Sequence, residues 1–128
     1  MSKKERMLAL RGDTSVHYNC AQSIAIPFAE EMGLSEEKAN DLLLNFGGGM
    51  GFGSVCGALT GALVTMGGMG LPQEKREELV NLFRAEFGHV DCGTLSAGLE
   101  RGTPEMRAVC DRFIEFCLDY VCRESGKE

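Results

Sequence analysis

Three cysteines are evenly spaced along the sequence, and each is predicted to lie near the start of a helix. Cys20, Cys56 and Cys92 are 36 residues apart, and a fourth, Cys110, follows in the predicted C-terminal helix. The N-terminus of a helix carries unpaired N–H groups and a partial positive charge, which stabilise a thiolate and lower the pKa of the thiol. These four cysteines are therefore candidates for thiol chemistry or for binding a metal through thiolates.

Cys56 is the strongest candidate for a nucleophile. It follows a glycine-rich stretch over residues 47–53 and then Ser54, a suitable N-cap, so we expect Cys56 in the first helical turn. A thiol in that position can be reactive at neutral pH. The glycine-rich stretch resembles a phosphate-binding loop, but no predicted strand precedes it and no Lys-Ser or Lys-Thr pair follows it, which argues against nucleotide binding.

Glycines line one face of the helix predicted after Cys56. Gly53, Gly57 and Gly61 recur at intervals of four residues. Interior glycine costs a helix about 1 kcal/mol relative to alanine, so a compensating benefit is expected. Either a second helix crosses closely at Gly57 and Gly61, which is the commoner arrangement, or these two residues form the binding surface of a flat cofactor.

Both histidines precede a helix-start cysteine by three residues, His17 before Cys20 and His89 before Cys92. Each could serve as a base for its cysteine, or the nitrogen and sulfur donors could form a tetrahedral metal site. No Cys-x-x-Cys is present, which argues against a thioredoxin-type dithiol and a zinc ribbon. Well-separated cysteines can still converge on an iron–sulfur cluster or another thiolate-bound metal.

Apolar spacing and capping residues predict helices throughout the chain and no strand. The predicted helices cover residues 3–11, 16–32, 35–46, 54–67, 73–87 and 104–124, with a short turn or helix near 92–98. Pro27 lies inside the second of these and is expected to kink it just after Cys20. We therefore expect an all-α bundle that forms a single domain over residues 1–128, with its core at about 16–122.

An internal repeat organises the middle of this bundle. Residues 32–38 resemble residues 69–75, and in both copies a helix ends at glycine (Gly33 or Gly70) and a new one begins at Ser35 or Pro72. Each copy is predicted to be a helical hairpin that opens near a cysteine. The bundle would then consist of two helical-hairpin repeats and a C-terminal helix.

Composition and charge exclude some classes of function. A net charge of −6 and the absence of Trp argue against binding nucleic acid. The N-terminus lacks the long apolar stretch of a secretory signal, which favours a cytoplasmic protein with reduced thiols. Residues 42–73 carry no charge, but ten of them are glycine, so a buried helix is favoured over a membrane span.

The cysteine pattern resembles that of a known family. The motif Asn-Cys-Ala-Gln at 19–22, the glycines at 47–51, Cys-Gly-Ala-x-x-Gly at 56–61, and then Cys92 and Cys110 are similar to the C_GCAxxG_C_C family. That family is described only as redox-active, with four characteristic cysteines. The resemblance covers roughly residues 16–115 and implies that Cys20, Cys56, Cys92 and Cys110 are the functional set. Cys117 and Cys122 would then be packing residues.

The leading hypothesis is a small cytoplasmic redox protein whose four cysteines converge in the helical core. They would act either in dithiol/disulfide exchange, with Cys56 attacking and a neighbouring cysteine resolving, or as ligands of a redox metal centre. The main alternative is a non-catalytic metal-binding module that uses the same cysteines with His17 or His89. A helical interaction module with packed thiols is the third hypothesis. The redox partner is not indicated by the sequence.

Overall fold

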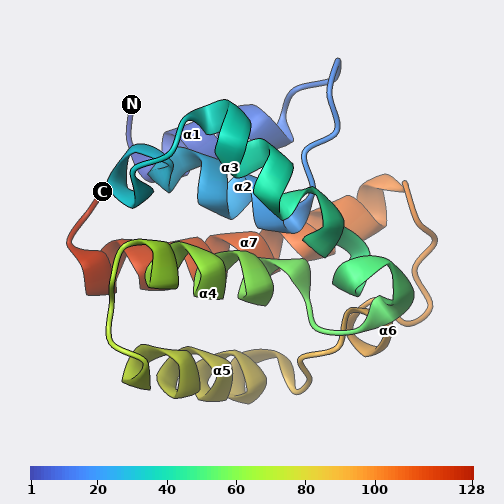
Figure 1. The fold of residues 1–128 in the computed structure, drawn as a ribbon. Coiled ribbons are helices and arrows are strands. Elements are labelled where there is room, and N and C mark those ends of the chain that lie inside the picture. The colour runs from blue at the N-terminus through green and yellow to red at the C-terminus, as the bar shows by residue number, and fades with distance from the viewer.

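Helix α4, residues Gly57–Gly68, lies in the middle of the computed structural model, which describes all of residues 1–128 (Figure 1). Helices α1, α2 and α3 cover one side of the layer formed by α4 and α7, and α5 covers the other. The remaining helices are α1 (Lys3–Arg11), α2 (Cys20–Ala25), α3 (Glu36–Leu43), α5 (Glu74–Phe87), α6 (Cys92–Leu95) and α7 (Pro104–Ser125). The only β pairing is an isolated bridge between Val55 and Asp91, so the all-α prediction is confirmed.

Local capping signals explain where several helices begin. Ser2 and Asn19 each form a capping box with the side chain three residues on, Glu5 and Gln22 respectively, at the starts of α1 and α2. Thr103 accepts a hydrogen bond from the Met106 amide at the start of α7, where Pro104 occupies the first turn. Most predicted helix limits are accordingly within one to three residues of the observed ones.

The predicted helix over residues 16–32 is shorter than expected. It begins only at Cys20, because Asn19 is its N-cap, and its α-helical part ends at Ala25. Pro27 has no N–H with which to continue the α-helical hydrogen bonding, so the chain continues as two 3₁₀ turns, Ile26–Phe28 and Glu30–Met32. The break therefore lies at Ala25 and not just after Cys20 as predicted.

Helices α2 and α4 cross closely because α4 presents glycine at the contact. A Cβ on Gly61 would lie 2.7 Å from the Cα of Ala21, and one on Gly57 would lie 2.9 Å from the Phe46 carbonyl oxygen. Only glycine fits at this spacing of backbones. Helix α2 therefore packs against both glycines. A role for Gly57 and Gly61 in binding a cofactor stays a prediction.

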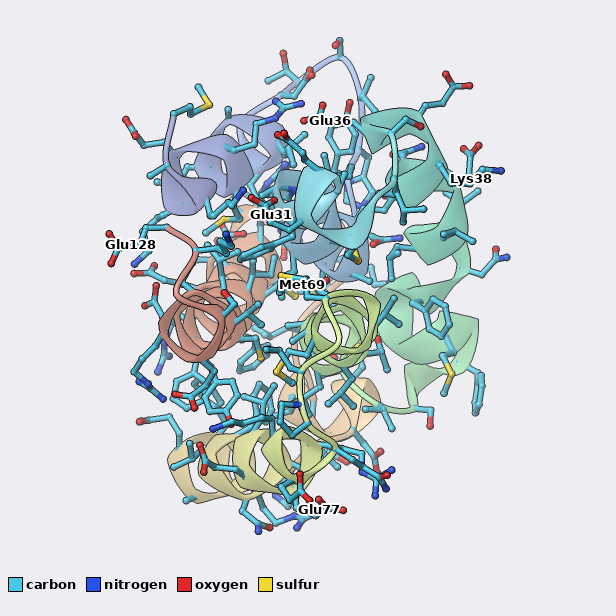
Figure 2. All side chains as sticks on the ribbon, turned by 60° about the vertical axis from the view of Figure 1, so that its left-hand side comes forward. Glu31, Glu36, Lys38, Met69, Glu77 and Glu128 are labelled. Atoms are coloured by element: carbon cyan, nitrogen blue, oxygen red, sulfur yellow. The ribbon has the colours of Figure 1, made fainter.

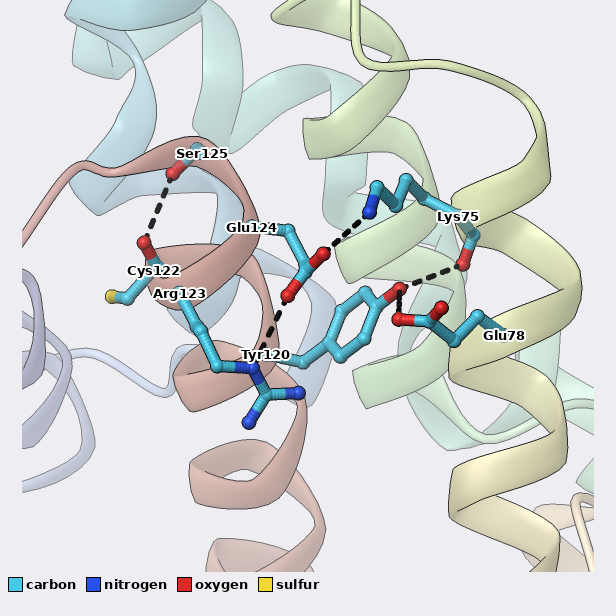
Figure 3. Close-up of polar contacts among 7 residues, drawn as sticks. All are labelled: Lys75, Glu78, Tyr120, Cys122, Arg123, Glu124 and Ser125. Carbon is cyan, nitrogen blue, oxygen red and sulfur yellow. Dashed lines mark hydrogen bonds and ion pairs between the residues drawn. The ribbon is translucent and has the colours of Figure 1, made fainter.

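Helix α5 is attached to α7 by an aromatic cluster and by polar contacts. Four phenylalanines pack with tilted or edge-on rings whose centroids are 4.7–6.0 Å apart: Phe83 and Phe87 from α5 with Phe113 and Phe116 from α7. Near the other end of the α5–α7 helix pair, the Tyr120 hydroxyl donates to the Glu78 carboxylate at 2.8 Å, and Lys75 forms an ion pair with Glu124 (Figure 3). These contacts fix α7, which carries Cys110.

The arrangement as two hairpin repeats stays a prediction. The turns are alike locally, because Gly33 and Gly70 both adopt the left-handed conformation, with φ of 74° and 76°. Charged side chains, including Glu36, Lys38 and Glu77, lie on the outside of the molecule (Figure 2). No helix is both long enough and apolar enough to span a bilayer.

Candidate functional site: a cavity lined by four cysteines

All four cysteines singled out from the sequence line one cavity of about 520 Å³. It lies between the starts of α2, α4 and α6 and the first half of α7, on the side where α4 and α7 begin in Figure 1. The distances between the four residues along the sequence do not indicate how close they are in space, since each belongs to a different element. The predicted convergence of Cys20, Cys56, Cys92 and Cys110 on one place in the bundle is therefore observed.

Cys20 is positioned by the cap of its own helix. It is the first residue of α2, and the N-cap residue Asn19 donates from its side-chain amide to the carbonyls of Leu43 and Leu44, at 3.3 and 3.0 Å. These bonds tie the start of α2 to the end of α3. Cys110 faces it from α7, in the second turn of that helix.

Cys56 and Cys92 are positioned together by the isolated bridge. The Cys56 amide donates to the Val90 carbonyl at 2.8 Å, and the Cys92 amide donates to the Ser54 carbonyl at 2.6 Å. The bridge pairs Val55 with Asp91, so both cysteines lie next to the paired residues and on the same face of the bridge. Helix α4 begins at Gly57 with Cys56 itself as N-cap, not with Ser54 as predicted.

The glycine-rich stretch turns the chain back on itself toward this bridge. Gly48, Gly49, Gly51 and Gly53 all have positive φ. A Cβ on Gly49 would lie 2.5 Å from the Ser54 amide nitrogen and 2.8 Å from the Cys92 Cβ. The glycines therefore allow the segment that carries Cys56 to approach the segment that carries Cys92.

Cys20 and Cys110 interact directly. A hydrogen bond between the two side chains raises the pKa of Cys20 well above its ordinary value, and desolvation of this half-buried residue adds to the rise. The same bond, together with Arg11 and Arg101, lowers the pKa of Cys110 to about 7 despite partial burial. At neutral pH the Cys20 thiol is thus the donor, and a substantial fraction of Cys110 is the thiolate acceptor.

The other two cysteines are held in the thiol form. Burial raises the pKa of Cys56 to about 11, although the Ala58 and Leu59 amides at the start of α4 oppose that rise. Burial also raises the pKa of Cys92, against the effects of Arg101 and Ser96. The expected lowering of thiol pKa at helix N-termini is therefore outweighed by desolvation. The lowered pKa belongs instead to Cys110, which lies inside a helix.

Three arginines complete the cavity, and the sequence analysis did not identify them. Arg11 is buried; its Nε is 2.7 Å from the Asp111 carboxylate and its Nη1 donates to the Tyr18 carbonyl at 2.9 Å. Arg107 donates to the Arg11 carbonyl, and Arg101 lies beside Gly48. One signal was available, because Arg107 is three residues before Cys110 in the same helix and shares a face with it.

The two histidines differ in position. His17 is an exposed residue of the cavity lining, and its pKa is lowered by partial burial and by the charges of Arg11 and Arg107. His89 is exposed and is not part of the lining. The parallel spacing His17–Cys20 and His89–Cys92 thus does not produce two equivalent pairs.

No three or more His, Cys, Asp or Glu side chains are arranged to hold a metal ion. The four sulfurs share the cavity without forming a ligand set. Cys117 is fully buried in the main core, and Cys122 is half-buried and packs against that core. Neither lines the cavity, in line with the packing role predicted for both.

A comparison with protein families agrees with the motif. Residues 18–123 match a family model described as "Putative redox-active protein (C_GCAxxG_C_C)". The matched region contains all four cysteines of the cavity. No curated protein and no solved structure matches the chain.

Proposed function

The chain belongs to the C_GCAxxG_C_C family, and from this premise we propose that it performs thiol–disulfide exchange with Cys20 and Cys110 as its dithiol. The observation that carries the proposal is that both side chains line the four-cysteine cavity and that each shifts the pKa of the other. Two neighbouring cysteines are the reactants that an intramolecular disulfide requires. The attacking group in disulfide exchange is a thiolate, and Cys110 is the cysteine that supplies one near neutral pH.

Cys110 fits the attacking role better than Cys56. Cys56 is only 3% exposed and its pKa is raised to about 11, so it is both covered and protonated at neutral pH. Cys110 is partly exposed within the cavity and lies near two guanidinium groups that favour its charge. The neighbouring thiol, Cys20, is the resolving residue.

The reaction then has two balanced steps. The Cys110 thiolate attacks one sulfur of a substrate disulfide, a mixed disulfide forms, and the other half leaves as a thiolate. Cys20 gives its proton to this leaving thiolate and attacks the Cys110 sulfur, which releases the second half of the substrate. The substrate disulfide gains two electrons and leaves as one thiol and one thiolate, which takes its proton from water, while the protein dithiol is oxidised to a disulfide. A dithiol reductant returns it to the starting state.

A metal centre is the second candidate, because all four sulfurs line the same cavity. Cys20, Cys56, Cys92 and Cys110 would be its ligands, as an iron–sulfur or other thiolate-bound centre. The sulfurs would have to move together for this, since they are not arranged as a ligand set. Metal content and visible spectrum after purification without oxygen separate the two candidates: stoichiometric iron with charge-transfer absorption favours the centre.

The exchange proposal is tested by titration in dithiol/disulfide buffers followed by mass spectrometry of the peptides. We expect oxidation to remove two hydrogens and to link Cys20 to Cys110. Cys110→Ser should abolish reaction with a small disulfide, whereas Cys122→Ser, a half-buried cysteine of the same helix outside the cavity, should leave it unchanged. Undiminished reaction of the Cys110→Ser variant would refute the proposal.

A further inference from the structure

The cavity concentrates positive charge in a chain that is acidic as a whole. The net charge is −6, yet the cavity lining includes Arg11, Arg101 and Arg107 and no Asp or Glu. His17 adds a titratable group at its exposed edge. A concave site lined by charge of one sign focuses its field and raises the local concentration of ligands of the opposite charge.

Two of these arginines have no carboxylate partner. Arg11 is committed to Asp111, and the ion pairs elsewhere involve neither Arg101 nor Arg107. Arg107 is held in place by the Arg11 carbonyl, which leaves its charge uncompensated. Arg101 lies against Gly48, where a Cβ would come within 2.8 Å of the guanidinium, so this glycine makes room for it.

We propose that the cavity binds a small disulfide that carries carboxylates, with Arg101 and Arg107 on the carboxylates and Cys110 facing the disulfide. This inference rests on the proposed exchange function and names the substrate class for the same site. Guanidinium groups bind carboxylates through paired, charge-assisted hydrogen bonds. The volume of about 520 Å³ falls within the range of small-molecule sites.

Charge compensation explains why the arginines and the cysteines belong together. An anionic disulfide approaching a thiolate is repelled, and the first step moves the thiolate charge onto a leaving half that already carries a carboxylate. The unpaired guanidinium groups of Arg101 and Arg107, both exposed residues of the lining, offset the repulsion at both stages. A cationic disulfide gains nothing from this arrangement and is repelled by the arginines.

The test compares three small disulfides that differ in charge: 3,3′-dithiodipropionate, with two carboxylates, 2-hydroxyethyl disulfide, which is neutral, and cystamine, with two ammonium groups. For each disulfide, the rate of Cys110 oxidation is divided by the rate at which the same disulfide reacts with 2-mercaptoethanol. This division removes differences in the intrinsic reactivity of the three disulfides. We expect the dicarboxylate to react at least about tenfold faster than the neutral compound, and cystamine to react slower. Added salt should reduce the difference.

Arginine variants identify the groups responsible. Arg101→Gln and Arg107→Gln should each lower the ratio of dicarboxylate to neutral rates by roughly tenfold, as expected for loss of one charge-assisted contact. The ratio is insensitive to any change in the thiolate fraction of Cys110, because that fraction affects both rates equally. Arg84→Gln replaces an exposed arginine of α5 that has no acidic partner and lies outside the cavity, and should leave the ratio unchanged.

The outcomes separate this inference from the function on which it rests. If Cys110→Ser blocks reaction with all three disulfides but the ratio is near one in the unmodified protein, the substrate class is wrong and exchange stands. If the ratio of dicarboxylate to neutral rates is high but neither arginine variant changes it, the assignment of Arg101 and Arg107 to the carboxylates is wrong. If Cys110→Ser reacts normally with the neutral compound, the exchange function itself fails.

Discussion

The side chains of Cys20 and Cys110 both line the cavity, and each shifts the pKa of the other, which couples the first residue of α2 to the second turn of α7. The hydrogen bond that accounts for these opposite shifts keeps Cys20 protonated and favours the thiolate of Cys110. Both residues are half-buried, but the charges of Arg11 and Arg101 both act on Cys110, whereas only that of Arg11 acts on Cys20. The member of the pair with two guanidinium groups near its sulfur is thus the one that carries the charge.

Removing the donor should raise the pKa of Cys110. We expect Cys20→Ala to move it from about 7 toward the ordinary thiol value of about 8.5, because the largest stabilising contact of the thiolate is lost. Cys20→Ser retains a hydroxyl donor and should give a smaller rise. The pH dependence of the alkylation rate of Cys110, followed by mass spectrometry, measures both. Equal pKa values in the Ala and Ser variants would show that the bond is not the cause.

The rate of exchange should follow the ionisation of Cys110. Because its pKa is lowered to about 7, the rate with a neutral disulfide should rise about tenfold per pH unit below that value and level off above it. Arg11→Gln removes a guanidinium near the sulfur and should shift the profile to higher pH. A profile that keeps rising to about pH 9 would instead assign the attack to a thiol of ordinary pKa.

Burial of Cys56 predicts a loss of stability at alkaline pH. Its pKa is raised to about 11 in the folded protein, so the unfolded chain releases this proton at lower pH than the folded chain. Between about pH 9 and 11 the folded state binds more protons, and the free energy of unfolding falls as pH rises. Two pKa units correspond to roughly 2.7 kcal/mol, and a Cys56→Ala variant should lose correspondingly less stability over that interval. Urea unfolding at about pH 8 and about pH 11 measures the difference, and parallel declines in both proteins would contradict this prediction.

The glycine crossing between α2 and α4 should tolerate no side chain. In Gly61→Ala the new Cβ would meet the Ala21 backbone at 2.7–2.8 Å, so the helices must move apart at a cost of about 1–3 kcal/mol. Gly67→Ala, in the same helix with nothing within 4 Å of its Cβ, should be neutral or slightly stabilising. Thermal unfolding of the two variants gives the comparison. A similar melting temperature for both would mean that α2 and α4 are less closely packed.

Movement of α2 would also displace Cys20. The Gly57 position contacts the Cys20 Cβ region, where an added Cβ would lie 3.2 Å away. The helix crossing therefore sets both the stability of the core and the position of the resolving thiol.

Elements that depend on near neighbours in the chain could be predicted from the amino-acid sequence. Capping residues such as Asn19 and Thr103 satisfy the amides of their own helices, so most helix limits were predictable within a few residues. The four cysteines that line the cavity were also identifiable, from their spacing and motif. Pro27 was identified as a disruption of its helix, but the position of the break was not, because the 3₁₀ turn that contains Pro27 and the one after it absorb the disruption.

Which cysteine carries the charge, and what surrounds it, depends on contacts that form only in the folded chain. The pKa of a thiol depends on burial and on through-space neighbours, and these outweighed the helix N-terminus at Cys56. Arg11 is far from Cys110 in the sequence, Arg101 lies in the loop before α7, and no local pattern shows that either meets Cys110. Packing of α1 and α7 around the starts of α2 and α4 brings them together, and long-range packing of this kind is not encoded in local spacing.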